Sequence, residues 1–247
     1  YVQFLARSFK AFSSIKNYVN GVKLLHLYCS SPFPDLKSFE LTLLYRGLAR
    51  LNPHLPRQAL AITPELLLEF AKLMNFSNHV DLTYWCLFIF LFFLMARKSN
   101  LVPMSAASFN PRKQLCRSHI LQGTSSLMVI IQWSKTIQYG ERKLTIPLLT
   151  IPNSPLCPVT AYKRMCRMIP APLSAPAFCV PVHNSWQSIT YSQLQAKLKS
   201  LVVATGRDPE AYSSHSFRRG GATWAFKAKV PPYLIQLHGD WRKIGRA

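Results

Sequence analysis

The chain is 247 residues long, and 49% of these residues are hydrophobic, which excludes a disordered basic tail. This length allows either one large domain or two smaller ones, each with a proper core. Lys and Arg number 30 against 9 for Asp and Glu, so the formal net charge is +21. A fold cannot neutralise that excess internally. The charge predicts a polyanionic partner, with nucleic acid as the first candidate and an anionic membrane surface as the second.

The basic residues are spread along the chain. No carboxylate lies between Asp81 and Glu141 or between Glu141 and Asp208, yet both intervals contain several Lys and Arg residues. This spread predicts a surface that follows a long anion. A single basic tail would instead gather the Lys and Arg residues in one segment.

The six cysteines show no Cys-x-x-Cys spacing, and several lie in apolar runs. They predict reduced core thiols of an intracellular protein and argue against zinc. No secretory signal is visible. The chain begins with Tyr1 and stops at Ala247 within a pattern, so we expect a fragment of a longer protein whose targeting signal is hidden.

The first part of the chain predicts a small, basic helical module. Apolar residues recur at helical spacing over 2–29, where Ser13 and Ser14 are expected to cap a helix from Ile15. A further helix is predicted over 38–50 after a proline-containing turn.

A domain boundary is predicted at the segment that contains Pro53 and Pro56, because two prolines favour an extended, semi-rigid connection. We therefore divide the chain into a helical domain (1–51), a linker (52–62) and a second domain (63–247).

The second domain begins with a helix start at Thr63, which is followed by Pro and Glu. An almost wholly apolar run then spans 82–96. A membrane span is the rival interpretation, but a span needs ~20 apolar residues and this run is shorter. We favour a central helix buried on all sides, which delivers Arg97 at the edge of the core. There, Arg97 either pairs with a carboxylate or awaits an anion, and acids nearby in the sequence are absent.

The remaining segments predict an α+β pattern. Strands are expected over 127–133 and 143–148, joined by a hairpin connection that carries Lys135. Other predicted elements are a helix from Cys157, a proline-rich loop over 170–181, a helix over 192–203, a helix opened by His215, a short helix after Pro231 and Pro232, and a turn at 239–241 that leaves Trp241 on a loop.

His215 and Arg218 lie three residues apart at a helix start, where positions i and i+3 share a face. An imidazole that moves a proton and a guanidinium that grips a phosphate suit phosphodiester chemistry. Taken singly, a His, a Trp or a loop Lys is more often structural or solvated. The functional interpretation therefore depends on all of these residues together.

The order and spacing of these residues resemble the tyrosine recombinase (phage integrase) family. The resemblance covers nearly the whole chain: Arg97-Lys-Ser-Asn-Leu101 stands for the family's Arg-x-Ser-x-Leu, and Lys135 precedes a basic strand that ends in Ile-Pro-Leu148. His215-Ser-Phe-Arg218 and then Gly239-Asp-Trp241 complete the pattern. The details look most like recombinases of eukaryotic mobile elements of the DIRS and Crypton type.

The sequence departs from the family pattern at several positions. Asn100 stands where the family often has an acid that supports the first Arg. His238 is an alternative to Trp241 for the late position, although spacing after Gly239 favours Trp241. The family's nucleophilic Tyr would fall beyond Trp241, and no tyrosine occurs there before the chain stops. Tyr233 precedes Gly239 and is better interpreted as a packing residue.

The resemblance implies a mainly α fold with a small β-sheet (α+β), made of an N-terminal core-binding domain and a catalytic domain. It implies DNA cleavage and rejoining through a covalent 3′-phosphotyrosine, without metal or small-molecule cofactor. Arg97 and Arg218 would hold the scissile phosphate, Lys135 would act as general acid, His215 would bond the phosphate and aid proton movement, and Trp241 would pack on the nucleophile's helix and donate to the phosphate.

The implied partner is double-stranded DNA, with self-assembly into a dimer or tetramer on it. The expected location is nuclear if the host is eukaryotic. A catalytically inactive, domesticated DNA-binding protein of the same fold is the alternative, and a membrane protein that spans at 82–96 is a third hypothesis.

Overall fold

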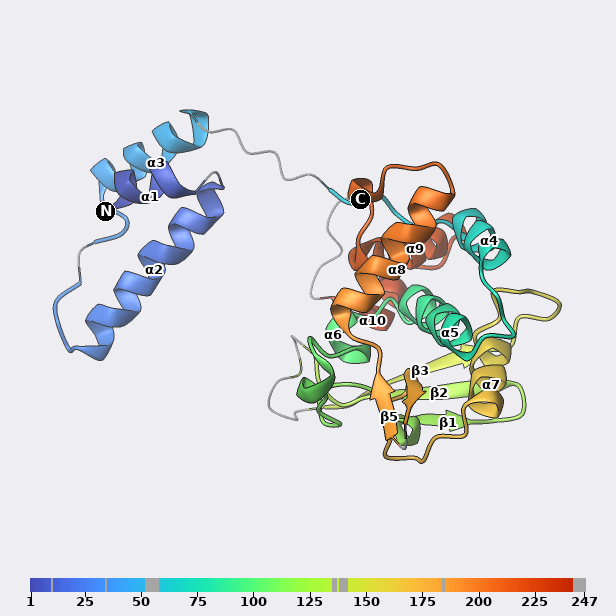
Figure 1. The fold of residues 1–247 in the computed structure, drawn as a ribbon. Coiled ribbons are helices and arrows are strands. Elements are labelled where there is room, and N and C mark those ends of the chain that lie inside the picture. The colour runs from blue at the N-terminus through green and yellow to red at the C-terminus, as the bar shows by residue number, and fades with distance from the viewer. Residues whose placement is uncertain are drawn as a thin grey trace. The chain divides into compact units, whose positions relative to one another are not determined.

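The computed structural model describes the whole chain except residues 10, 34, 52–57, 135–136, 138–141, 184 and 242–247. It consists of two compact units, Tyr1–Gln58 and Ala59–Ala247 (Figure 1). Most of the predicted linker lies outside the described residues. Its end, 59–62, belongs to the larger unit, because Ile62 is fully buried and its N–H donates to the Ser216 carbonyl over 3.0 Å. The larger unit therefore starts at Ala59 and not at Thr63.

The described residues of the smaller unit form three helices: α1 (Val2–Ser8), α2 (Phe12–Tyr28) and α3 (Phe39–Leu51). Its core is formed by Val2, Leu5, Ile15 and Val19. The predicted cap at Ser13 and Ser14 is wrong, because α2 starts earlier, with Ala11 as its N-cap. The predicted helix over 38–50 is confirmed to within one residue as α3.

The larger unit is built around α5 (His79–Phe93), and every residue from Leu82 to Phe92 is buried. This confirms the predicted central helix. Figure 1 shows it between α8 and α9 on one side and α7 with the strands on the other, and α7 and α9 pack directly against it. Over the part of the chain that the structure describes, no helix combines the length and apolar character needed to cross a bilayer.

The larger unit also contains α4 (Pro64–Leu73), α6 (Lys98–Leu101), α7 (Pro158–Met168), α8 (Tyr191–Ala204), α9 (Ser214–Lys227) and α10 (Pro232–His238), with short 3₁₀ turns at Ala106–Ser108, Arg117–His119 and Pro209–Ala211. The other predicted helices of this unit are confirmed as α4, α7, α8, α9 and α10, whereas the short α6 and the 3₁₀ turns were not predicted. Thr63 caps α4 through its side chain, as predicted, because its hydroxyl accepts the Leu66 N–H.

Where the structure describes the larger unit, it also contains two small antiparallel sheets. One contains β1 (Ile120–Gln122), β2 (Ser126–Ile131) and β3 (Leu144–Leu149) in that order, and the other pairs β4 (Cys179–Val182) with β5 (Ser185–Ser188). The two predicted strands are confirmed as β2 and β3, whereas β1, β4 and β5 were not predicted. β4 overlaps the predicted proline-rich loop, because a two-stranded ribbon tolerates Pro181 on an edge. The predicted mainly α fold with a small β component is confirmed.

All six cysteines are free thiols. Cys86, Cys116, Cys157 and Cys179 are buried and Cys166 is half-buried, as core thiols should be. Cys29 is exposed at the end of α2, so the prediction of a core thiol is wrong there.

Two glycines allow α9 to approach the chain closely. A Cβ on Gly220 would lie 1.9 Å from the Ile62 carbonyl oxygen, and one on Gly221 would lie 2.1 Å from the Phe92 carbonyl oxygen. No side chain fits at either position. The approach sets the depth at which α9 packs against the end of α5, where the site residues lie.

We predict that Gly220→Ala lowers the free energy of unfolding by about 2 kcal/mol or more, because the helix must shift away from Ile62. Urea denaturation measures this. Gly47→Ala is the control: Gly47 lies within α3 with open space around it, and the change should stabilise by up to about 1 kcal/mol. An unfolding midpoint of Gly220→Ala equal to that of the unsubstituted protein would contradict the packing described.

Candidate functional site

Arg97 lies just after α5, at the N-cap of α6. The α5 helix ends at Phe93, and Met95 then adopts a left-handed conformation with φ of 47°. Arg97 therefore precedes a new helix and is not the last residue of the buried one. Its side chain is 21% exposed, and Nη1 lies 3.7 Å from Oδ2 of Asp240. The expectation that acids are absent around Arg97 holds along the sequence but is wrong in space.

Arg218 is buried on α9, with 8% of its surface exposed. Its Nη1 donates to the Met95 carbonyl, and its Nη2 donates to the Gly239 carbonyl over 2.6 Å. Burial, and after it the positive charge of Arg97, lower the pKa of Arg218 to about 10, while Asp240 acts in the opposite direction. The guanidinium still carries its charge at neutral pH. Two main-chain carbonyls hold it between the end of α5 and the end of α10.

Trp241 covers the guanidinium of Arg218, whose central carbon lies 4.0 Å from the centre of the indole ring. The ring also packs against the small cluster of Met95, Ala225 and Ile235. Gly239 is required beneath it, because a Cβ there would lie 1.8 Å from the indole. The structure thus places Trp241 directly against one of the predicted site arginines.

His238, the alternative late residue, has a different environment at the end of α10. Its Nε2 lies 2.7 Å from the Phe93 carbonyl oxygen and donates to it. Burial lowers the pKa of His238, and this hydrogen bond partly opposes the shift. His238 fastens α10 to the end of α5, whereas Trp241 faces the guanidinium.

His215 lies in the first turn of α9, where its N–H donates to the Ser213 hydroxyl over 3.3 Å. Loss of hydration is the largest cause that lowers its pKa, followed by the positive charges of Lys98, Arg218 and Arg97. The predicted His therefore lies within the electrostatic field of both predicted arginines. This lowered pKa favours the neutral form of the imidazole at pH 7.

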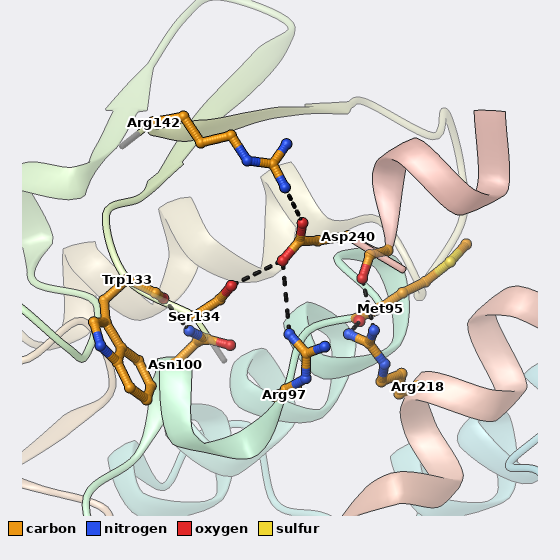
Figure 2. Close-up of polar contacts among 9 residues, drawn as sticks. Met95, Arg97, Asn100, Trp133, Ser134, Arg142, Arg218 and Asp240 are labelled. Atoms are coloured by element: carbon orange, nitrogen blue, oxygen red, sulfur yellow. Dashed lines mark hydrogen bonds and ion pairs between the residues drawn. The ribbon is translucent and has the colours of Figure 1, made fainter. Parts of the chain in front are cut away.

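Asp240 was not among the predicted site residues. Its side chain is 6% exposed and receives the Ser134 hydroxyl over 2.8 Å and Arg142 Nη2 over 2.5 Å, besides the ion pair with Arg97. Figure 2 shows Arg142 and Arg97 approaching this carboxylate from opposite sides. One signal in the sequence could have identified it: Asp240 is the only acid after Glu210, and it stands beside Trp241.

Asn100, the departure from the family pattern, contacts the hairpin. Its amide donates to the Trp133 carbonyl over 2.5 Å, next to Ser134 (Figure 2). Lys135 itself lies outside the described residues. Within the connection, Ser134 and Ile137 exchange paired main-chain hydrogen bonds of 3.0 Å.

The prediction that Tyr233 is a packing residue is wrong. It lies on α10 and is 67% exposed. A short amphipathic helix buries few positions, and Ile235 is the buried residue of α10.

The described part of the site can bind an anion. It combines two guanidiniums, an indole that covers one of them, one identified carboxylate and an imidazole whose pKa both guanidiniums lower. Fixed guanidiniums bind the oxygens of phosphate groups well. No group of three or more His, Cys, Asp or Glu side chains that could hold a metal ion occurs among the described residues.

Comparison with solved structures identifies the fold. The Tn1549 transposon integrase, in complex with transposon right end DNA, matches with a TM-score of 0.58 at 12% identity over 98% of this chain and 75% of that one. The XerH site-specific recombinase bound to difH substrate, in a pre-cleavage complex, gives 0.53 at 13% identity over 83% of this chain and 60% of that one. Its post-cleavage complex with palindromic difH substrate gives 0.51 at 12% identity, over 75% and 47%.

The chain thus spans between about half and three fifths of the XerH recombinase in these complexes. At these identities the likeness establishes the fold alone, which is that of the Tn1549 integrase and the XerH recombinase. No family model and no curated protein sequence matches the chain.

We predict that Lys98→Gln raises the pKa of His215 toward its ordinary value of 6.5, because Lys98 is the strongest of the charges that lower it. NMR titration of the imidazole measures the midpoint. The unfolded chain takes up the proton more readily than the folded one, so stability should fall as the pH drops through about 6.5. Lys113→Gln, which removes a charge not involved in the shift, is the control. A midpoint unmoved by Lys98→Gln would refute the field described here.

Proposed function

We propose that this chain is the DNA-binding and catalytic core of a site-specific tyrosine recombinase, which cuts and rejoins double-stranded DNA. The observation that carries the proposal is the convergence of Arg97 and Arg218 from separate segments on one spot, beside Trp241, in a fold of this type. The helical unit would act as the core-binding domain and the larger unit as the catalytic domain. Assembly into a dimer or tetramer on DNA, kinship with DIRS and Crypton elements and a nuclear location in a eukaryotic host belong to the same proposal.

The two arginines are suited to bind a phosphodiester. Arg218 uses one N–H on each terminal nitrogen for carbonyls, and a guanidinium has five N–H donors, so others stay available. Arg97 lies 3.7 Å from Asp240, beyond ordinary hydrogen-bond range, so this ion pair leaves its N–H groups to an incoming oxygen. Donors that are already in place stabilise the charge that develops on the phosphorus oxygens in the transition state.

The proposed reaction needs no external energy. A tyrosine oxygen forms a bond to phosphorus as the bond from phosphorus to the 5′-oxygen breaks, and the energy is kept in the phosphotyrosine for the reverse step. Lys135 gives the leaving 5′-oxygen a proton, while His215, whose pKa is lowered, accepts the proton that the tyrosine hydroxyl loses as it attacks. The attacking tyrosine would lie beyond Trp241 in the same chain or belong to a neighbouring protomer.

We predict that the chain binds duplex DNA with an affinity that falls steeply with salt, because each neutralised phosphate contributes about −0.9 to the slope of log K against log[salt]. Arg97→Ala should weaken binding and reduce that slope by about 1. Fluorescence anisotropy at several salt concentrations measures both. Lys199→Gln is the matched loss of charge, because Lys199 pairs with Glu210 away from the site, and it should leave the slope nearly unchanged.

We also predict that a form of the protein that continues past Ala247 to its next tyrosine forms a covalent adduct with a nicked suicide DNA substrate. Arg218→Ala should reduce the rate of adduct formation by about 10²- to 10³-fold, by analogy with the loss of one transition-state donor. Gel separation of the protein–DNA adduct measures it. Tight binding by the extended protein without any adduct would favour the inactive, domesticated DNA-binding protein instead.

A further inference from the structure

We propose that Asp240 is a positioning residue that holds Arg97 in place by tying it to the base of the hairpin between β2 and β3. The inference rests on the proposed function of the arginine pocket, which is the site formed by Arg97, Arg218 and Trp241. Asp240 is a buried acid in this site, whose other groups are suited to bind a negative charge.

The carboxylate of Asp240 gathers donors from separate parts of the chain. Oδ2 accepts the Ser134 hydroxyl over 2.8 Å and faces Nη1 of Arg97 at 3.7 Å, and Oδ1 accepts Nη2 of Arg142 over 2.5 Å. Ser134 follows β2, and Arg142 precedes β3. Asp240 therefore bridges both ends of the hairpin connection to the start of α6 (Figure 2).

The carboxylate of Asp240 lies closer to Ser134 and Arg142 than to Arg97, and the two kinds of contact have different roles. The short contacts with Ser134 and Arg142 fix the orientation of the carboxylate, because they are hydrogen bonds of ordinary or short length. The longer contact with Arg97 acts through charge. It draws the guanidinium to one place without occupying its donors, so Arg97 is held and still presented to a ligand. The side chain of Arg142 is 51% exposed and that of Arg97 is 21% exposed, so the carboxylate is covered by groups that keep access to solvent.

Asn100 shows why this acid is not supplied from α6 itself. The amide of Asn100 donates to the Trp133 carbonyl over 2.5 Å, and a carboxylate at that position would place oxygen against oxygen. Asn100 thus provides a second tie between α6 and the hairpin base, one that requires a donor. The negative charge for Arg97 comes instead from the turn after α10.

The same turn serves both arginines. Gly239 lets the indole of Trp241 lie over Arg218, and its carbonyl accepts from Arg218. The next residue, Asp240, has φ of 53°, a left-handed conformation that Asp and Asn tolerate better than most residues. Asp240→Asn therefore keeps the size and the backbone preference, removes the charge and replaces one of the two acceptor oxygens with an amide donor.

The experiment compares Asp240→Asn with the unsubstituted protein, both extended past Ala247 to the next tyrosine. Two quantities are measured: the NMR order parameter of the Arg97 side-chain N–H in the DNA-free protein, assigned with Arg97→Lys, and the single-turnover rate of covalent adduct formation at saturating DNA. We expect the substitution to lower the order parameter and to slow adduct formation by at least tenfold. Affinity for DNA should stay equal or increase, because the net charge becomes more positive.

Asp81→Asn is the matched control. Asp81 pairs with Lys197 over 2.7 Å, and the substitution makes the same change in net charge without touching the pocket. It should leave the Arg97 order parameter and the rate of adduct formation unchanged. Ser134→Ala should cause a smaller loss of rate than Asp240→Asn, and no further loss when combined with it, since Ser134 acts through the carboxylate.

An unchanged Arg97 order parameter in Asp240→Asn would overturn the proposal, and so would a loss of rate matched by an equal loss of DNA affinity and a lowered Tm, which indicates general structural damage. If the unsubstituted protein forms no adduct, the proposed function fails, and the order parameter of Arg97 still decides whether Asp240 holds it.

Discussion

The structure of the site depends on a buried guanidinium that donates to two main-chain carbonyls. Arg218 joins Met95, just after α5, to Gly239, just after α10, and contributes both bonds from the middle of α9. A cation removed from water in this way needs such partners, and its lowered pKa records the cost of the burial. The partners are available because Gly220 and Gly221 let α9 lie directly against neighbouring backbone.

The hydrogen bonds of Arg218 also determine where the other groups of the pocket lie. Once Gly239 is fixed by Arg218, the next two residues have little freedom, and they direct a carboxylate toward Arg97 and an indole onto Arg218. The positive charges of Arg97 and Arg218, which would repel one another, are thus brought together. The buried carboxylate of Asp240 lies between Arg97 and the hairpin. The pKa of His215 is lowered mainly by loss of hydration, and the same crowding of charge lowers it further.

Local rules in the sequence were enough to predict most elements. The helix start at Thr63 predicted α4, and the long apolar run predicted α5. The spacing of His215 and Arg218 predicted the helix that carries them. β4 escaped prediction because a proline within it argued for a loop, and the start of α2 was misplaced because the serines near it lie inside the helix. Tyr233 was expected to pack, but α10 buries another face. Asp240 could not be assigned to Arg97 from the sequence, because that contact joins segments far apart in the chain and depends on how α10 is docked.

A crystal structure of this protein bound to duplex DNA tests most directly whether Arg97 and Arg218 bind the same phosphodiester. We expect the non-bridging oxygens of one phosphodiester to lie within about 3.2 Å of guanidinium nitrogens of both arginines. Asp240 should still face Arg97 on its hairpin side. DNA bound across another face of the larger unit, with no phosphate at these two arginines, would contradict this expectation.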